Sequence, residues 1–271
     1  MKLIDLIKYC VFIAGQKKPI TTGYGIYKEK EILKILHNKD FNTDNLKPGY
    51  GYRLDERVIE YPWLFSRLPT TGGNLLDAGS ALNLKYILEQ DGLSSSKNIF
   101  ISTLFPEELC FWKDKICYVY EDFRNSCFRD NYFDWVVSLS VIEHIGMDNT
   151  KFYTNDTLKK ENQKYSFLSV INELNRILKP GGTLFLTVPF GKYHNHGWLQ
   201  VFDSKMLDQL LETFSPSSFV ENHFRYATGG WHISSREESS ECTYFDYYEN
   251  KKYDEDFAAA ARGIACLELV K

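Results

Sequence analysis

Short apolar runs alternate with polar turns and helix-like segments along most of the chain, and each run has the length of a strand. The run at 133–139 is almost continuously apolar, which is typical of a strand covered on both faces. The predicted strands are a first one that ends at Leu76, followed by 98–104, 118–123, 133–139, 183–188, 219–226 and 264–270. Strands separated by helices in this way indicate an open α/β sheet.

Helical patterns lie between several of these strands. Segment 166–178 has apolar residues at Phe167, Ile171, Leu174 and Leu178, the stripe of a helix packed on a sheet, and Lys179-Pro180-Gly181-Gly182 ends it. The other predicted helices are 28–37, 55–68, 82–90 and 254–262.

The first fifteen residues are apolar, but Asp5 and Lys8 interrupt them. An amphipathic helix packed on the domain is therefore favoured over a segment that lies on a membrane surface.

A tight turn follows the first strand and reads Asp77-Ala78-Gly79-Ser80-Ala81-Leu82-Asn83. Asp77 places a carboxylate at the end of the strand, and Gly79 lets a ligand approach bare backbone. Structural joints use the same residue types, so the later segments decide what this turn means.

Those segments are Glu121-Asp122-Phe123 at the end of the third strand, Glu143-His144 after the fourth, and the joint Leu178-Lys179-Pro180-Gly181-Gly182. With the turn, they resemble the class I S-adenosylmethionine (SAM)-dependent methyltransferases, from about residue 74 to the C-terminus. The resemblance implies a Rossmann-like seven-stranded α/β sheet, mostly parallel with an antiparallel last strand, with helices on both faces and SAM at the strand tips. Residues 1–71 are then an N-terminal helical extension or lid, and 72–271 the methyltransferase domain, with an insertion at about 227–262.

The composition narrows the class of protein. A chain of 271 residues, 44% hydrophobic and 25% charged, fits one globular α/β unit with additions. A net charge of −4 offers no basic surface for nucleic acid, so nucleic acid is not an expected partner. No membrane span is expected, and a homodimer stays open.

The six cysteines form no C-x-x-C pair and have no metal-like spacing with the six histidines. We therefore expect no disulfide framework and no zinc site, and a cytoplasmic location. No metal cofactor is predicted; the alternative is Mg²⁺ held by Asp148 and Asn149.

The resemblance also implies a set of cofactor-binding residues. The first turn should hold the methionine part of SAM, while Asp122 accepts the adenine amino group and Phe123 packs on the ring. Thr103 stands where most members place an acidic residue for the ribose hydroxyls, so ribose contact should be weaker or come from elsewhere. Of the family's three turn glycines, the chain keeps only Gly79. The predicted set is Asp77, Gly79, Ser80, Thr103, Leu104, Asp122, Phe123 and Ser140.

Methyl transfer from a sulfonium is an in-line displacement, and a hydroxyl acceptor also needs a base. The loop after the fifth strand carries His196 and Trp198 at the mouth of the predicted site. His196 is the preferred base and Trp198 a stacking wall. His144 is the second catalytic candidate, with a structural or cofactor-side role as its alternative.

The predicted acceptor-contacting residues are Tyr50, Tyr52, Arg53, Asp148, Asn149, His194 and Trp198. The first three, set among glycines, form either a flap over a bound ligand or a packing loop, and both interpretations stay open.

Ser138-Leu139-Ser140-Val141 stands where methyltransferases acting on base amino groups commonly have an Asn/Asp-Pro-Pro-Tyr-type turn, which favours an oxygen acceptor. The chain is similar to methyltransferases of bacterial surface-polysaccharide pathways, which implies O-methylation of a sugar or nucleotide-linked sugar. One alternative is a different acceptor, such as another small molecule, a lipid or a protein side chain. The other is a SAM-fold scaffold without catalysis, because the glycine turn is incomplete and Thr103 replaces the acid.

Overall fold

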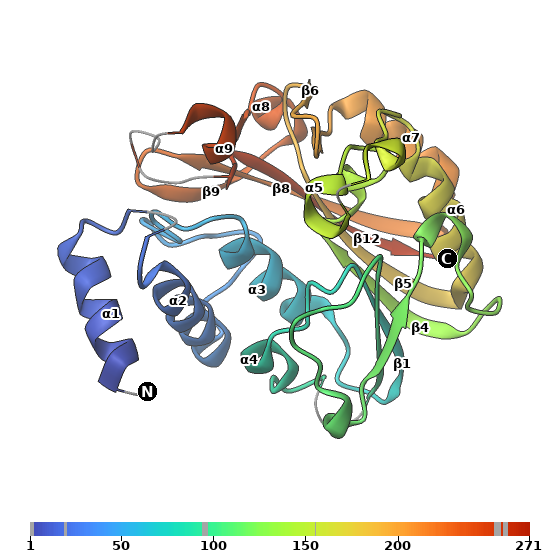
Figure 1. The fold of residues 1–271 in the computed structure, drawn as a ribbon, viewed down its shortest axis with the longest axis horizontal. Coiled ribbons are helices and arrows are strands. Elements are labelled where there is room, and N and C mark those ends of the chain that lie inside the picture. Colours follow the sequence, from blue (N-terminus) through green and yellow to red (C-terminus); the bar gives the residue numbers. More distant parts are fainter. Residues whose placement is uncertain (1–2, 19–20, 94–96, 155, 252–255, 257–259) are drawn as a thin grey trace.

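An eight-stranded sheet forms the centre of the computed structural model (Figure 1). Residues 3–18, 21–93, 97–154, 156–251, 256 and 260–271 are described by the structure. The strand order is β3-β2-β1-β4-β5-β12-β8-β9. These strands are β1 (Gly73–Ala78), β2 (Lys97–Thr103), β3 (Cys117–Tyr120), β4 (Phe133–Leu139), β5 (Leu178–Pro189), β8 (Ser218–Ala227), β9 (Gly230–Ser234) and β12 (Gly263–Val270).

The five strands from β3 to β5 in this order are parallel, and β12 runs antiparallel to both β5 and β8. The predicted Rossmann-like α/β fold class is therefore confirmed, with its mostly parallel sheet and antiparallel last strand. The sheet has eight strands where seven were predicted, because β9 at the start of the insertion pairs with β8 as an edge strand.

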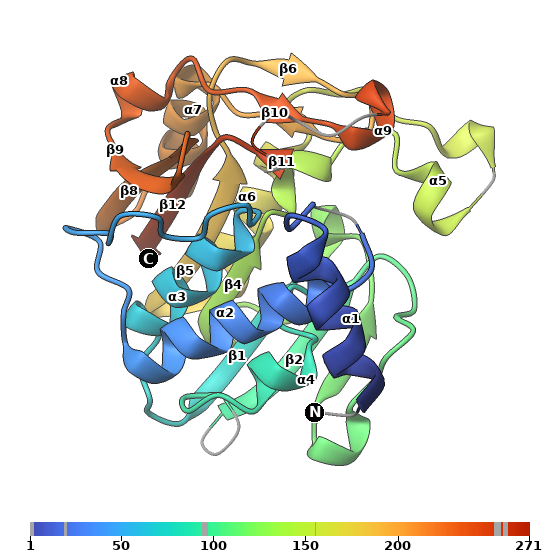
Figure 2. The same ribbon diagram turned by 90° about the vertical axis from the view of Figure 1, so that its left-hand side faces the viewer.

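Different helices cover the two faces of the sheet (Figures 1 and 2). Leu75 packs in the core beneath the N-terminal helices, while its neighbour Leu76 packs in the core on the other face. Successive strand side chains point to opposite faces, so a strand with both sides covered must be apolar throughout. The helices are α2 (Tyr24–Asn38) and α3 (Arg57–Arg67) on the first face, and α6 (Phe167–Ile177) and α7 (Ser204–Phe214) on the second.

The predicted helix after the first strand is much shorter than expected. Only α4 (Lys85–Leu88) is helical, where 82–90 was predicted. The carboxylate of Asp77 accepts hydrogen bonds from the backbone N–H groups of Ala81 and Leu82, and Asn83 bonds to the loop after β2. These contacts hold residues 81–83 in the turn, so the helix begins later.

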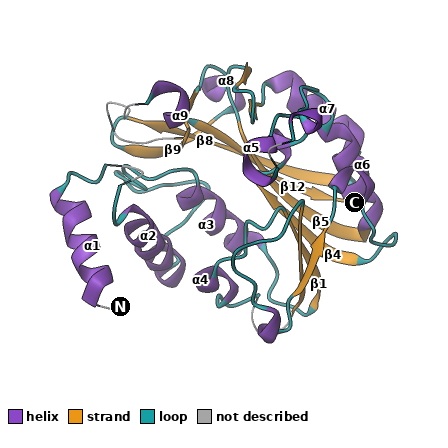
Figure 3. Ribbon diagram, viewed as in Figure 1, coloured by secondary structure: helices purple, strands orange, loops and turns teal. Residues whose placement is uncertain are grey.

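The predicted helix 254–262 is wrong at its C-terminal end. Ala260–Ala261 is a strand, β11, that pairs with β10 (Tyr244–Phe245) inside the insertion, and this pairing supplies the backbone partners that a helix would have supplied. Residues 252–255 and 257–259 of that prediction lie outside the described residues. The insertion also contains α8 (Arg236–Ser239) and α9 (Tyr247–Asn250) (Figure 3).

The predicted N-terminal helix is present as α1 (Leu3–Ala14), and it packs on α2 through one buried residue, Phe12. The ring of Phe12 lies 5.8 Å from that of Tyr24 and 5.3 Å from that of Tyr27. The exposed apolar residues of α1 are Leu3, Ile4, Leu6, Ile7, Val11 and Ile13. Among the described residues, no helix has the length and apolarity to cross a membrane.

Candidate cofactor and acceptor site

A pocket of about 380 Å³ opens at the C-terminal ends of the parallel strands. The turns after β1, β2, β3 and β4 contribute to its walls, because the ends of parallel strands meet at one edge of the sheet. Its lining includes Gly79, Thr103, Leu104, Glu107, Asp122, Phe123, Arg124, Val141, His144, Asn149, Phe152, Tyr153, Glu161 and Trp198.

The turn after β1 forms one wall of this pocket. Asp77 is fully buried, and its two oxygens accept hydrogen bonds from Ala81 and Leu82 at 3.1 and 2.8 Å. Burial raises the pKa of Asp77 to about 7. Gly79 has φ 117°, and a Cβ there would lie 2.2 Å from Cγ2 of Val141. Asp77 thus shapes the turn, and the missing side chain of Gly79 leaves room at the pocket wall.

Ser80, the third predicted residue of this turn, has φ 65° and does not line the pocket. Its hydroxyl oxygen is buried and has no hydrogen-bond partner among the described residues. Ser80 thus has an unsatisfied buried hydroxyl next to Gly79, where a Cβ would fill the space at the pocket wall. This arrangement suits a polar ligand such as the methionine part of SAM.

Asp122 and Phe123 line the pocket after β3, and Asp122 is already paired. Its carboxylate accepts hydrogen bonds from Nε of Arg124 at 3.0 Å and from a terminal guanidinium nitrogen at 2.6 Å. Partial burial opposes ionisation, but the bonds from Arg124 prevail and hold the pKa of Asp122 below its usual range. Glu161 binds the other side of Arg124.

Glu107 is a pocket residue that sequence reasoning missed. Thr103 and Leu104 line the pocket as predicted, and Glu107 follows them in the same loop. The sequence feature that could have revealed Glu107 is that it is an acidic residue four positions beyond Thr103, the tip of β2, rather than at the tip itself. The pocket therefore has a carboxylate on the side where the family's acidic residue was missing.

His144 lines the pocket after β4, and Trp198 determines where its proton lies. Nδ1 of His144 is 2.9 Å from the carbonyl oxygen of Trp198. A carbonyl only accepts, so Nδ1 carries the hydrogen and Nε2 keeps its lone pair. Burial lowers the pKa of His144 to about 4, so the ring is neutral at pH 7.

Glu143 lies beside this imidazole, with its Oε1 atom 3.8 Å from Nε2 of His144. Burial raises the pKa of Glu143 well above its usual value. Burial thus disfavours the charged form of both neighbours, which opposes an ion pair between them.

Aromatic side chains form a second wall. The ring of Trp198 lies 5.2 Å from that of His144 and 5.5 Å from that of Phe152 in α5 (Thr150–Tyr153). Asn149 donates a hydrogen bond to the carbonyl of His144 at 2.7 Å. Trp198 and Asn149, both predicted to contact the acceptor, are thus brought together with His144.

Ser140 lies outside the pocket and fastens the turn after β4 to α3. Its hydroxyl donates to Oε1 of Glu60 at 2.6 Å, and the same carboxylate accepts from Thr187 and pairs with Arg57. The N-terminal region is therefore joined directly to the strand tips beside the pocket.

Tyr50, Tyr52 and Arg53 do not line the pocket. Tyr50 is buried and donates to the carbonyl of Val58, and the backbone N–H of Arg53 donates to Tyr226. Tyr52 lines a separate cavity of about 550 Å³ beside the N-terminal helices. These contacts are those of a packing loop.

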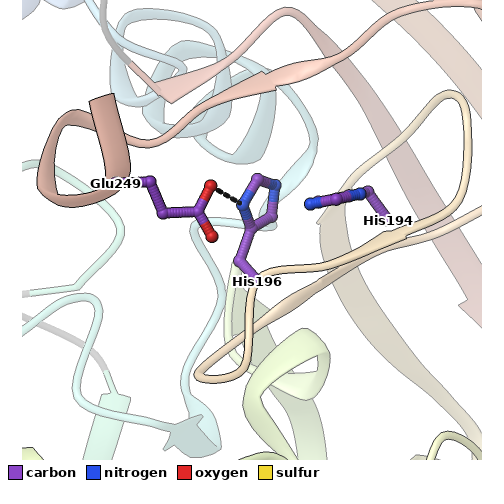
Figure 4. A group of neighbouring side chains, drawn as sticks. All are labelled: His194, His196 and Glu249. Carbon is purple, nitrogen blue, oxygen red and sulfur yellow. Dashed lines mark hydrogen bonds and ion pairs between the residues drawn. The ribbon is translucent and has the colours of Figure 1, made fainter.

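His196, His194 and Asp148 do not line the pocket either. Nδ1 of His196 lies 3.1 Å from a carboxylate oxygen of Glu249, next to His194 (Figure 4). Asp148 accepts from the hydroxyl of Thr150 and pairs with Lys160.

A family model described as "Methyltransferase domain" matches residues 92–186, from the turn before β2 into β5. The match supports the predicted enzyme class, a SAM-dependent methyltransferase, and SAM as its cofactor.

Solved structures with a similar fold include the carbon methyltransferase of CurJ, with 11% identity, 79% of this chain and 52% of that chain covered, and a TM-score of 0.43. The alignment thus spans about half of the CurJ chain. A Burkholderia thailandensis 1,6-didemethyltoxoflavin-N1-methyltransferase, solved with S-adenosylhomocysteine, has 12% identity, coverages of 92% and 89%, and a TM-score of 0.46. The [4+2]-cyclase SpnF has 16% identity, coverages of 89% and 93%, and a TM-score of 0.48. No curated protein matches the sequence.

Proposed function

We propose that this methyltransferase transfers the methyl group of SAM to a hydroxyl of a small polar acceptor, a sugar or nucleotide-linked sugar used in surface-polysaccharide assembly. The observation that carries the choice of oxygen is His144, a neutral imidazole on the pocket wall with an unprotonated Nε2. A hydroxyl must lose its proton as it is methylated, and a positioned imidazole can take that proton.

SAM supplies an electrophilic methyl carbon on a positively charged sulfur. The chain must hold the acceptor oxygen in line with it, so that the new C–O bond forms while the C–S bond breaks and leaves its electron pair on sulfur. Nε2 of His144 accepts the hydroxyl proton. The carbonyl of Trp198 holds the Nδ1 hydrogen, which keeps the ring in the receptive tautomer and stabilises the imidazolium that forms.

The turns after β1, β2 and β3 are assigned to the cofactor. Gly79 and Ser80 would hold the methionine part, Asp122 and Phe123 the adenine, and Glu107 the ribose hydroxyls. Thr103 and Leu104 complete that wall. Asp77 acts on the cofactor by positioning, since both its oxygens already bind the turn.

The aromatic wall is assigned to the acceptor. Trp198, Phe152 and Tyr153 line the pocket. Sugars pack their C–H faces on aromatic rings, while their hydroxyls need polar partners. Asn149 supplies a polar group nearby. All six cysteines are free, in keeping with a cytoplasmic location for this reaction.

One observation favours a second candidate, a SAM-fold protein that binds without catalysis. Arg124 occupies both oxygens of Asp122, so an adenine amino group must share that carboxylate. A binding-only protein tolerates the weaker cofactor contact better than an enzyme does.

Calorimetric titration of the purified protein with SAM and with S-adenosylhomocysteine tests the cofactor assignment. We expect micromolar binding of both, weakened in Asp122→Ala. Folded protein that binds neither compound contradicts the enzyme assignment.

The acceptor is tested by incubating the protein with methyl-labelled SAM and a panel of nucleotide sugars, free sugars, phenols and peptides. Label transferred to a sugar hydroxyl is the expected result. Label found only on a phenol, a nitrogen or a peptide contradicts the sugar assignment, and SAM binding without transfer to any acceptor favours the binding-only candidate.

A further inference from the structure

Three side chains of metal-binding type meet beside Trp198, outside the cofactor pocket. They are His194, His196 and Glu249, and one ligand atom from each lies within 4.8 Å of the other two (Figure 4). None of the three lines the pocket.

The two histidines face the same way because of the strand that carries them. β6 (His194–Asn195) forms a hairpin with β7 (Gln200–Val201), and His196 continues it by donating its N–H to Leu199 at 2.9 Å. Residues two apart in extended chain lie on one face, so His194 and His196 stand side by side with ring centroids 4.3 Å apart.

His196 is not satisfied by the protein groups around it. Its side chain is only 5% exposed, and Nε2 has no hydrogen-bond partner among the described residues. A buried imidazole nitrogen left without a partner is unfavourable, so this nitrogen is open to a ligand. In Figure 4 the edge of the ring opposite Glu249 is turned toward His194, so the two other candidate ligands flank the His196 ring.

We propose that His194, His196 and Glu249 bind a divalent transition-metal cation of the zinc type. Two imidazoles and one carboxylate are a donor set that zinc takes in proteins, with a fourth position left for water or another ligand. Tetrahedral ligands around zinc lie about 3.3 Å apart. The exposed side chains of His194 and Glu249 can rotate to close the remaining distance.

Such an ion would link the insertion to the β6–β7 hairpin that follows β5. Glu249 belongs to α9, and Asp246, just before α9, already accepts a hydrogen bond from Nε1 of Trp198 at 2.7 Å. A cation bound by Glu249 of α9 and His194 of β6 adds a second link between these two segments, next to the hydrogen bond between Trp198 and Asp246. The metal thereby orders the aromatic wall without contacting SAM.

The test uses full-length protein without a histidine tag, stripped with a chelator and titrated with Zn²⁺ by calorimetry and with Co²⁺ by visible absorption. We expect one equivalent of each metal to bind, with the ligand-field bands of a four-coordinate cobalt site and a rise in Tm with Zn²⁺. His194→Ala and Glu249→Gln change exposed side chains, so both should fold, and each should weaken binding at least about tenfold.

His37→Ala is the matched control, because His37 is an exposed histidine at the end of α2, and this variant should bind metal like the parent chain. No stoichiometric binding by the parent chain overturns the proposal, as does equal binding by the parent chain and His194→Ala. SAM affinity, measured in the same samples, should be the same in His194→Ala, so a failure of the proposed function is seen separately.

Discussion

Nδ1 of His144 lies 2.9 Å from the carbonyl oxygen of Trp198, which joins the turn after β4 to the loop after β5. These residues are 54 positions apart, yet the contact assigns the tautomer of the one histidine in the pocket lining. The proposed chemistry depends on this contact.

His144→Asn removes the proposed base from a pocket wall that otherwise keeps its polar character. We expect kcat to fall by about 10²- to 10⁴-fold, the usual contribution of a positioned base, while SAM affinity changes little. Single-turnover methylation and calorimetry measure the two quantities. His37→Asn serves as the control, and an unchanged kcat in His144→Asn would remove His144 from the mechanism.

The pH dependence of activity follows from the same residue. Burial lowers the pKa of His144 to about 4, so the neutral ring persists from alkaline pH down to mildly acidic pH. In the free enzyme, kcat/KM should therefore stay level down to roughly pH 5 and fall as His144 becomes protonated below that. Circular dichroism at each pH confirms that the protein stays folded. An acid limb centred near 6.5, the ordinary value for histidine, would contradict a desolvated base.

Asp122→Asn tests the adenine contact while keeping the size of the side chain. Loss of a charged acceptor should weaken SAM binding by about 10- to 100-fold, because hydrogen bonds to charged groups contribute about 1.5–3 kcal/mol. Asp114→Asn, which changes an exposed aspartate that does not line the pocket, is the control. Equal SAM affinity for the two variants would mean that Asp122 serves only Arg124.

Gly79→Ala should damage the cofactor turn. The backbone there has φ 117°, and the added Cβ would lie 2.2 Å from a methyl group of Val141. We expect stability to fall by about 1–3 kcal/mol, measured by urea unfolding, together with weaker SAM binding. Adding Val141→Ala removes the two methyl contacts, but it leaves Cβ of residue 141 at 2.9 Å and does not change the backbone strain, so recovery should be partial. Complete recovery would show that the methyl contacts alone mattered.

Glu56, next to α3, should make stability depend on pH. Burial, and then the neighbouring charges of Asp55 and Glu60, raise the pKa of Glu56 from its usual 4.5 to about 8. The pKa of Glu56 is therefore higher in the folded chain than in the unfolded chain, so the unfolded chain loses this proton at a lower pH. The stability linked to Glu56 is full below about pH 4.5 and is lost as pH rises toward 8.

Glu56→Gln should lose less of its unfolding free energy between these two pH values than the parent chain does. Urea unfolding at a series of pH values measures the difference. Parallel curves for the two proteins would show that Glu56 is already ionised in the folded state.

Much of the sheet was predictable because each strand is a local apolar run and each turn has its own residue chemistry. The run 133–139 coincides with β4, and the pattern at 166–178 matches α6 to within one residue at each end. The helix at 82–90 was predicted too long because nothing local shows that Asp77 captures the backbone of residues 81 and 82. Likewise, the alanines at 260 and 261 favour a helix locally, but they pair with β10.

The sequence by itself determined the order of the strands and helices, the sharp turn at Asp77 and Gly79, and the edge of the sheet where the pocket forms. These follow from periodicity and backbone conformation, which act over a few residues. Tertiary structure decided which histidine reaches the pocket, that Arg124 pairs with both Asp122 and Glu161, and that Glu249 bonds to His196 beside His194, more than 50 positions earlier. Those contacts join distant segments, and only the packing of the insertion and loops onto the sheet brings them within a few ångströms of one another.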